Sequence, residues 1–134
     1  MERYESWFDR AKSSYELAKM TGNVEIYYED LCYQAQQAVE KSLKGLLIYY
    51  GVEPEFTHNI EILLNELEKF TMIPKDVRQA MKLTIYAVQT KYPGEYDEIT
   101  KEEYAKSIKI AKDCLDWVEN KIKETEKKGK VPAG

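Results

Sequence analysis

Apolar side chains recur every three or four residues along most of this 134-residue chain. That spacing places them on one face of an α-helix, whereas a half-buried β-strand would alternate apolar and polar residues. No stretch of the sequence alternates in that way between turn signals. The pattern therefore predicts an all-α protein. Helices are expected over residues 3–20, 24–50, 59–70 and 75–89, and from residue 100 onward.

Glycines and capping residues separate these segments. Gly22 follows the first segment and Gly51 the second, and both suit the left-handed conformation that often ends a helix. Thr57 is the expected N-cap of the third segment. Thr100 and Glu103 form a capping box at the start of the last segment. Short connections make successive helices antiparallel neighbours, so we expect an antiparallel up-and-down four-helix bundle with an additional short helix.

The bundle is predicted to be a single helical domain over residues 1–124, followed by a flexible C-terminal tail over residues 125–134. Its buried positions are expected to include Leu31, Ala35, Leu46, Leu63, Leu67, Ile108, Ala111 and Leu115. The fourth segment is expected to pack through Val77, Met81, Thr84, Ile85 and Val88.

Composition narrows the class of protein. The net charge of −4 argues against a general nucleic-acid-binding surface. No apolar run approaches the ~18 residues of a membrane span, and the N-terminus does not resemble a secretory signal, so a cytoplasmic location is expected. Cys32 and Cys114 are interpreted as small buried thiols. With one histidine and no cysteine cluster, neither a metal site nor a cofactor is predicted.

The second segment carries polar residues that its apolar stripe does not explain. Gln37, Lys41 and Lys44 share a face away from that stripe. Glu40 and Lys44 stand four residues apart, in the favourable order for an ion pair on a helix. One interpretation is a solvated face with intrahelical salt bridges. The other is a groove whose side chains donate hydrogen bonds to a phosphate or another anion.

Aromatic residues raise two further alternatives. Lys91 and Tyr92 belong to the loop KYPGEY, whose tyrosines either cap the end of the bundle or stack on a base or a partner. The second segment also holds tyrosines on more than one side, which indicates either an association surface or ordinary wet surface. These tyrosines are Tyr27, Tyr28, Tyr33, Tyr49 and Tyr50.

The single histidine does not by itself predict catalysis. His58 lies at the expected start of a helix, where a capping or hydrogen-bonding role is ordinary. A general base needs an orienting partner, and none is visible nearby in the sequence. The chain also lacks a glycine-rich phosphate loop and an H-E-x-x-H motif.

Several stretches together resemble the HEPN domain, a helical domain named for higher eukaryotes and prokaryotes nucleotide-binding. The most specific is QQAVEKSLKGLL followed by THNI; the stretches WFDRAKSSYELAK and KYP add to it, and the resemblance covers nearly the whole chain. The family usually has arginine before Tyr-Pro, where this chain has Lys91. Lysine keeps the charge but lacks the planar guanidinium fork.

The resemblance implies a four-helix core like the C-terminal domain of kanamycin nucleotidyltransferase, and frequent homodimerisation. Many relatives pair with a separate minimal nucleotidyltransferase, and some are toxin or antitoxin components. Others are ribonucleases that carry Arg-x(4–6)-His. None of the arginines here is followed by histidine at that spacing.

The resemblance favours the groove interpretation of the second segment. The candidate ligand-binding residues are Gln37, Lys41, Lys44, Lys91 and Tyr92. The lysines would contact an anion, the glutamine would hydrogen-bond and the tyrosine would stack; no residue is assigned a catalytic role. The sequence thus predicts a non-catalytic helical module that binds a nucleotide, a minimal nucleotidyltransferase or both. A metal-independent ribonuclease with a divergent site and a purely structural interaction protein stay open as alternatives.

Overall fold

The computed structural model describes residues 3–23, 25–89 and 98–127. Every regular element in these ranges is helical, which confirms the predicted all-α fold. The elements are α1 (Tyr4–Ala18), α2 (Tyr28–Tyr49), α3 (Ile60–Leu67), α4 (Lys75–Arg78), the 3₁₀ helix η1 (Gln79–Ile85), α5 (Tyr86–Gln89) and α6 (Lys101–Lys127).

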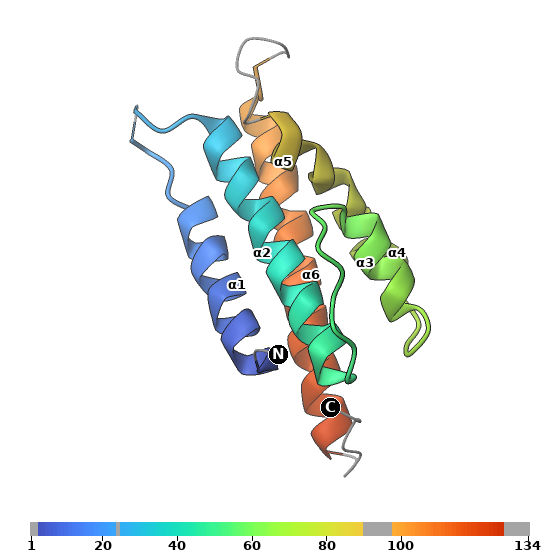
Figure 1. Ribbon diagram of the computed structural model, residues 1–134. Coiled ribbons are helices and arrows are strands. Elements are labelled where there is room, and N and C mark those ends of the chain that lie inside the picture. The colour runs from blue at the N-terminus through green and yellow to red at the C-terminus, as the bar shows by residue number, and fades with distance from the viewer. Residues whose placement is uncertain (1–2, 24, 90–97, 128–134) are drawn as a thin grey trace.

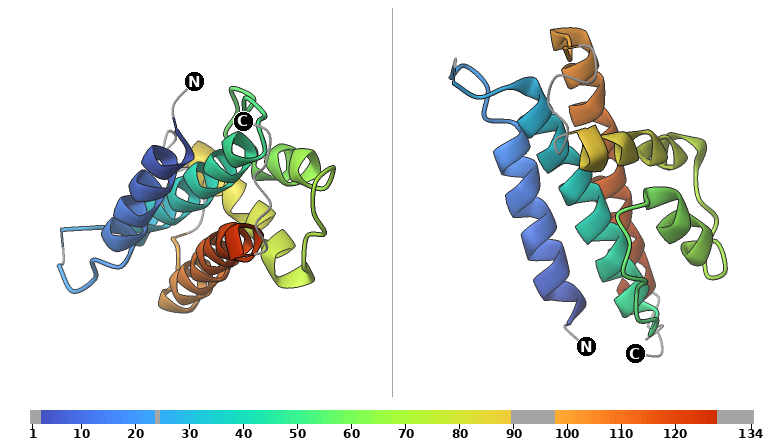
Figure 2. Two further views of the ribbon diagram at one scale, coloured as in Figure 1. Left: turned by 90° about the horizontal axis from the view of Figure 1, so that it is seen from below. Right: turned by 45° about the horizontal axis from the view of Figure 1, so that its top comes forward.

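Helix α2 occupies the centre of the bundle. Figure 1 shows α1, α2 and α6 as three long helices side by side, with α1 antiparallel to α2. The α4–η1–α5 segment returns beside α3 and supplies the fourth unit of the bundle, so α3 is the additional short helix (Figures 1 and 2). Helix α2 contacts α1, α3, η1, α5 and α6. In the part of the chain described, no helix is both long and apolar enough to span a membrane.

The expected stop at Gly51 is confirmed and has a clear cause. Gly51 has a φ of 83°, in the left-handed region that favours glycine. Its N–H donates to the carbonyl of Ile48, and the N–H of Val52 donates to the carbonyl of Leu47. This Schellman arrangement satisfies carbonyls that the end of α2 would leave without partners. It also turns the chain back along α2, where the 52–59 connection carries His58.

The start of α3 corrects one prediction. Thr57 is not the N-cap; that position belongs to Asn59, whose side chain accepts a hydrogen bond from the N–H of Glu61 at 3.0 Å. Thr57 acts one step earlier, because its Oγ1 accepts from the N–H of Asn59 at 3.0 Å. The N–H of Ile60 donates to Oγ1 of Thr84 in η1 at 3.1 Å. These bonds fix the backbone on the C-terminal side of His58.

The core follows the predicted stripes with one exception. Seven of the eight expected core positions are buried, among them Leu46 and Leu63 with no exposed surface. Ile108 is half-buried and packs at the margin of the core. The buried stripe of α6 passes through Ser107 and Cys114, which places Ile108 on its flank.

The largest difference from expectation lies in residues 75–89. The sequence predicted one continuous α-helix, but its middle is the 3₁₀ helix η1. A 3₁₀ helix has about three residues per turn, so every third residue shares a face. The buried face is accordingly Val77, Ala80, Leu83 and Tyr86. The α-helical stripe predicted for packing is wrong at three positions, because Met81, Ile85 and Val88 are 39%, 52% and 53% exposed.

The tyrosines of α2 are mostly used within the chain. Tyr28 stacks on Tyr104 of α6 with ring centroids 4.9 Å apart. Tyr50 stacks on Phe70 at 5.1 Å. Tyr49 is buried. Tyr33 is half-buried and Tyr27 is 70% exposed, so the alternatives of an association surface and ordinary wet surface now concern Tyr27.

The two cysteines confirm the interpretation of buried thiols. Both are free and buried. Burial raises the pKa of Cys32 to about 11 and that of Cys114 to about 12, which keeps each thiol protonated at neutral pH. Among the described residues, no three His, Cys, Asp or Glu side chains gather in a group that could hold a metal ion.

Candidate functional site

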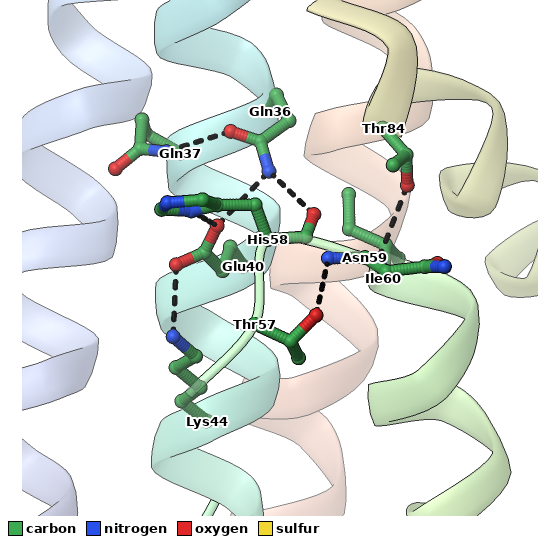
Figure 3. Close-up of polar contacts among 9 residues, drawn as sticks. All are labelled: Gln36, Gln37, Glu40, Lys44, Thr57, His58, Asn59, Ile60 and Thr84. Atoms are coloured by element: carbon green, nitrogen blue, oxygen red, sulfur yellow. Dashed lines mark hydrogen bonds and ion pairs between the residues drawn. The ribbon is translucent and has the colours of Figure 1, made fainter. Parts of the chain in front are cut away.

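A polar cluster lies where the 52–59 connection crosses α2. Figure 3 shows Gln36, Glu40 and Lys44 along the side of α2 beside the connection that carries His58, with Gln37 next to Gln36 on the side of α1. Helical spacing aligns residues 36, 40 and 44, since each lies one turn after the last. The cluster is thus built from one helical ridge and one side chain brought back by the turn at Gly51.

Glu40 is the buried centre of this cluster. Its Oε1 accepts a hydrogen bond from Gln36 Nε2 at 3.0 Å and lies 2.8 Å from His58 Nδ1. Its Oε2 pairs with the ammonium of Lys44 at 2.9 Å. Burial raises the pKa of the Glu40 carboxyl, but hydrogen bonds from His58, Lys44 and Gln36 outweigh burial and leave that pKa below its ordinary value. The buried carboxylate is therefore ionised and fully hydrogen-bonded.

The ionised Glu40 determines which nitrogen of His58 carries hydrogen. A carboxylate only accepts hydrogen bonds, so Nδ1 of His58 must be the donor. In the neutral imidazole, Nε2 then carries the lone pair. The His58 side chain is 61% exposed, so the ring is oriented by a buried partner while much of it faces solvent. This is the orienting carboxylate that the sequence did not reveal, because it lies 18 residues earlier in the chain.

The backbone of His58 is held as well. Gln36 Nε2 also donates to the carbonyl oxygen of His58 at 3.1 Å, and Gln37 Nε2 donates to Gln36 Oε1 at 2.7 Å. Two glutamines of α2 thus secure the connection from one side, while Asn59 begins α3 on the other. The imidazole is preorganised, since its peptide group and its ring are both fixed.

The three residues predicted on α2 separate into two environments. Lys44 is buried, because its ammonium pairs with Glu40 and lies 5.8 Å from the ring centre of Trp7 on α1. Gln37 and Lys41 are half-buried and lie nearer the surface. The solvated-face interpretation of Lys44 is wrong, although its expected ion pair with Glu40 does form.

Lys41 has a different set of neighbours. Its Nζ donates to Oγ of Ser14 on α1 at 2.9 Å. Among the described residues, no carboxylate forms an ion pair with it. Burial lowers the pKa of Lys41; the carboxylate of Glu40 opposes this and the cation of Arg10 adds to it. Lys41 is therefore a partly desolvated cation whose close partner is a neutral hydroxyl.

Lys91 and Tyr92 lie outside the described residues, so the predicted role of the KYP loop stays a prediction. The candidate residues chosen from the sequence did not include Gln36, Glu40 or His58. The four-residue spacing of a helix predicts that residues 36, 40 and 44 lie on one ridge. The contact between His58 and Glu40 depends on the path of the 52–59 connection, which the sequence does not reveal.

The central helix α2 is enclosed by the other helices and by the connection that folds back along it. This architecture is that of a small all-helical domain. The family model for the HEPN domain matches residues 4–121. The chain therefore belongs to the HEPN domain family.

Two solved structures are similar to this chain. The crystal structure of ST0689, described as an archaeal HEPN homologue, is 32% identical, covers 91% of this chain and 99% of its own, and superposes with a TM-score of 0.72. The crystal structure of TT1696 from Thermus thermophilus is 30% identical, covers 90% and 99% of the two chains, and has a TM-score of 0.78. A comparison with curated protein sequences finds no match.

Proposed function

We propose that this chain is a non-catalytic HEPN module that binds the phosphate of a nucleotide at the surface formed by Lys41 and Gln37. The observation that carries the proposal is the environment of Lys41. Its ammonium is partly desolvated and bonded to the neutral hydroxyl of Ser14. A phosphate arriving there gains a charge-assisted hydrogen bond and offsets the desolvation of the cation.

The neighbouring groups support a polar ligand. Gln37 is half-buried, and its amide oxygen can accept a hydrogen bond while Nε2 stays bonded to Gln36. Lys44 no longer belongs to the proposed contact set, because the buried pair with Glu40 occupies its ammonium. Lys91 and Tyr92 remain proposed contributors, a cation and a stacking ring respectively.

A titration with a nucleotide panel tests this proposal. Lys41→Ala is expected to weaken binding, Lys41→Arg to retain much of it, and added salt to weaken it further through screening. Lys109→Ala is the matched control, since Lys109 is an exposed lysine of α6 paired with Asp113. Binding that is identical in the wild type and Lys41→Ala would remove this surface as the ligand site.

The family context adds a proposed partner. We propose that the module works beside a minimal nucleotidyltransferase in a two-component system of the toxin–antitoxin kind, as a homodimer in the cytoplasm. An adjacent gene for such an enzyme, and co-purification of the two proteins, would support this assembly. A purely structural antitoxin would bind that partner yet no nucleotide.

A metal-independent ribonuclease is the second candidate, and the His58–Glu40 contact is the observation that favours it. Cleavage of RNA needs a base for the ribose 2′-hydroxyl and a cation for the phosphorane-like transition state. In the neutral imidazole, Nε2 of His58 has the lone pair of a base, and Lys41 is a cation on α2, the helix that also carries Glu40. An RNA digest with the wild type and His58→Ala decides: robust cleavage abolished by the substitution would overturn the non-catalytic proposal.

A further inference from the structure

One buried carboxylate determines the direction of the hydrogen bonds in the polar cluster on α2. Glu40 is ionised and only 4% exposed, so both of its oxygens act as acceptors alone. Every group that hydrogen-bonds to Glu40 must therefore donate to it. This requirement fixes the donor and acceptor atoms of its neighbours, and two of the acceptors that result lie at the surface of the cluster.

The first of these acceptors is Nε2 of His58. Nδ1 of the same ring lies 2.8 Å from Oε1 of Glu40 and donates to it. In the neutral imidazole Nε2 then carries no hydrogen and can only accept. The His58 side chain is 61% exposed, and its Nε2 has no hydrogen-bond partner among the described residues. A ligand can therefore reach this nitrogen.

The second acceptor is Oε1 of Gln37. Gln36 Nε2 donates both to Oε1 of Glu40 at 3.0 Å and to the carbonyl of His58 at 3.1 Å, which fixes the orientation of the Gln36 amide. Oε1 of Gln36 consequently accepts, and Nε2 of Gln37 donates to it at 2.7 Å. The amide oxygen of Gln37 is left as an acceptor that no described residue hydrogen-bonds.

Both acceptors lie close to the proposed phosphate site. Figure 3 shows the imidazole of His58 extending across α2 toward the side on which Gln37 lies. Lys41 follows Gln37 by one helical turn on the same ridge, and it contacts Ser14 of α1. The surface thus combines a cation suited to a phosphate with two acceptors suited to a hydrogen-bond donor.

We propose that this surface binds nucleotides whose base carries an exocyclic amino group, such as adenine, in preference to nucleotides whose base lacks one. An amino group has two hydrogens, one for each of the acceptors that Glu40 has fixed. A base without that group leaves His58 Nε2 and Gln37 Oε1 without the donor, so part of the binding free energy is lost. The inference rests on the proposed phosphate site at Lys41 and adds the class of base.

Calorimetric titration of the full chain with three ligands tests the preference. ATP carries the amino group, purine riboside triphosphate has hydrogen in its place, and inorganic triphosphate has no base. The measurements are made at pH 8, which favours the neutral imidazole. The wild type is expected to bind ATP about fivefold to tenfold more tightly than purine riboside triphosphate.

Substitution of the histidine makes the test specific. His58→Ala is expected to weaken ATP binding to the level of purine riboside triphosphate and to leave binding of inorganic triphosphate unchanged. Retained binding of inorganic triphosphate also shows that the variant is folded. Phe56→Ser is the control, because Phe56 is a fully exposed residue of the same connection.

The outcomes separate the base preference from the phosphate site. Equal affinities of the wild type for ATP and purine riboside triphosphate would overturn the base preference, and so would a preference that persists in His58→Ala. The phosphate site would still stand in either case if Lys41→Ala weakened all three ligands. Inorganic triphosphate that fails to bind, or that binds the wild type and Lys41→Ala alike, would instead overturn the proposed function and the base preference with it.

Discussion

Helix α2 and the α4–η1–α5 segment meet their surroundings in opposite ways. Helix α2 is covered by α1, α3, η1, α5 and α6, and even its polar residues Gln36 and Glu40 are buried. The α4–η1–α5 segment buries one face and leaves Met81, Ile85 and Val88 in solvent. The sequence predicted one α-helical stripe for the peripheral segment, whereas it left two interpretations open for the polar residues of α2.

The difference shows how position in the bundle changes the meaning of a sequence pattern. In α2 the buried carboxylate of Glu40 needs partners inside the protein, since a buried charge without a partner is costly. Those partners are Lys44, one turn further along α2, and His58, which the 52–59 connection brings back to the helix. In the peripheral segment a few apolar side chains could stay exposed, because such exposure costs little.

The largest expected effect is at the centre of α2. Leu46 has no exposed surface, so Leu46→Ala removes its packing and leaves a cavity. We expect a loss of ~2–5 kcal/mol in the free energy of unfolding. Urea denaturation followed by circular dichroism measures it. A loss below about 1 kcal/mol would mean that α2 is less enclosed than the structure shows.

The peripheral segment should respond according to its 3₁₀ face. Leu83 is almost completely buried, so Leu83→Ala is expected to cost an amount near the lower end of ~2–5 kcal/mol. Met81→Ser, on the exposed face, should change stability by no more than about 0.5 kcal/mol. The same urea titration compares the two. Equal losses would show that the segment packs as an ordinary α-helix in solution.

A smaller effect is expected from the buried ion pair. Lys44→Ala leaves Oε2 of Glu40 without its cation, while Gln36 and His58 still bind Oε1. We expect a cost of ~1–3 kcal/mol. Lys109→Ala, which breaks an exposed pair with Asp113, should leave the stability almost unchanged because solvent screens that pair. Thermal melts of the two variants measure the difference. Equal losses of stability would contradict the distinction between the buried and the exposed ion pair.

The smallest predicted effect is a dependence on pH. The folded pKa of Glu40 lies below its ordinary value of 4.5, so the native carboxylate binds protons less readily than the unfolded one. Its contribution is complete above that ordinary value and is lost as pH falls through the folded pKa. The stability advantage of the wild type over Glu40→Gln should therefore shrink over the acidic range below about pH 4.5. An advantage that stays constant over this range would contradict the ionised state of Glu40.

The sequence could predict part of the candidate site but not its centre. Lys41 and Gln37 were identified from helical spacing, which is local information. The role of Glu40 depends on His58, which reaches it after the chain has ended α2 and turned back. No local pattern reports such a contact between residues 18 positions apart. Lys44 was predicted to contact an anion, but tertiary structure buries it beside Glu40 and Trp7.

The amino-acid sequence by itself determined the helical class, the stop at Gly51 and most of the core, because helix periodicity and glycine conformation act over a few neighbouring residues. Tertiary structure alone decided that residues 79–85 form a 3₁₀ helix. The same segment offers apolar residues at both three- and four-residue spacing, so its intrinsic pattern fits either helix. Burial of Leu83 and Tyr86 against the bundle selected the 3₁₀ face, and Met81 was thereby left at the surface.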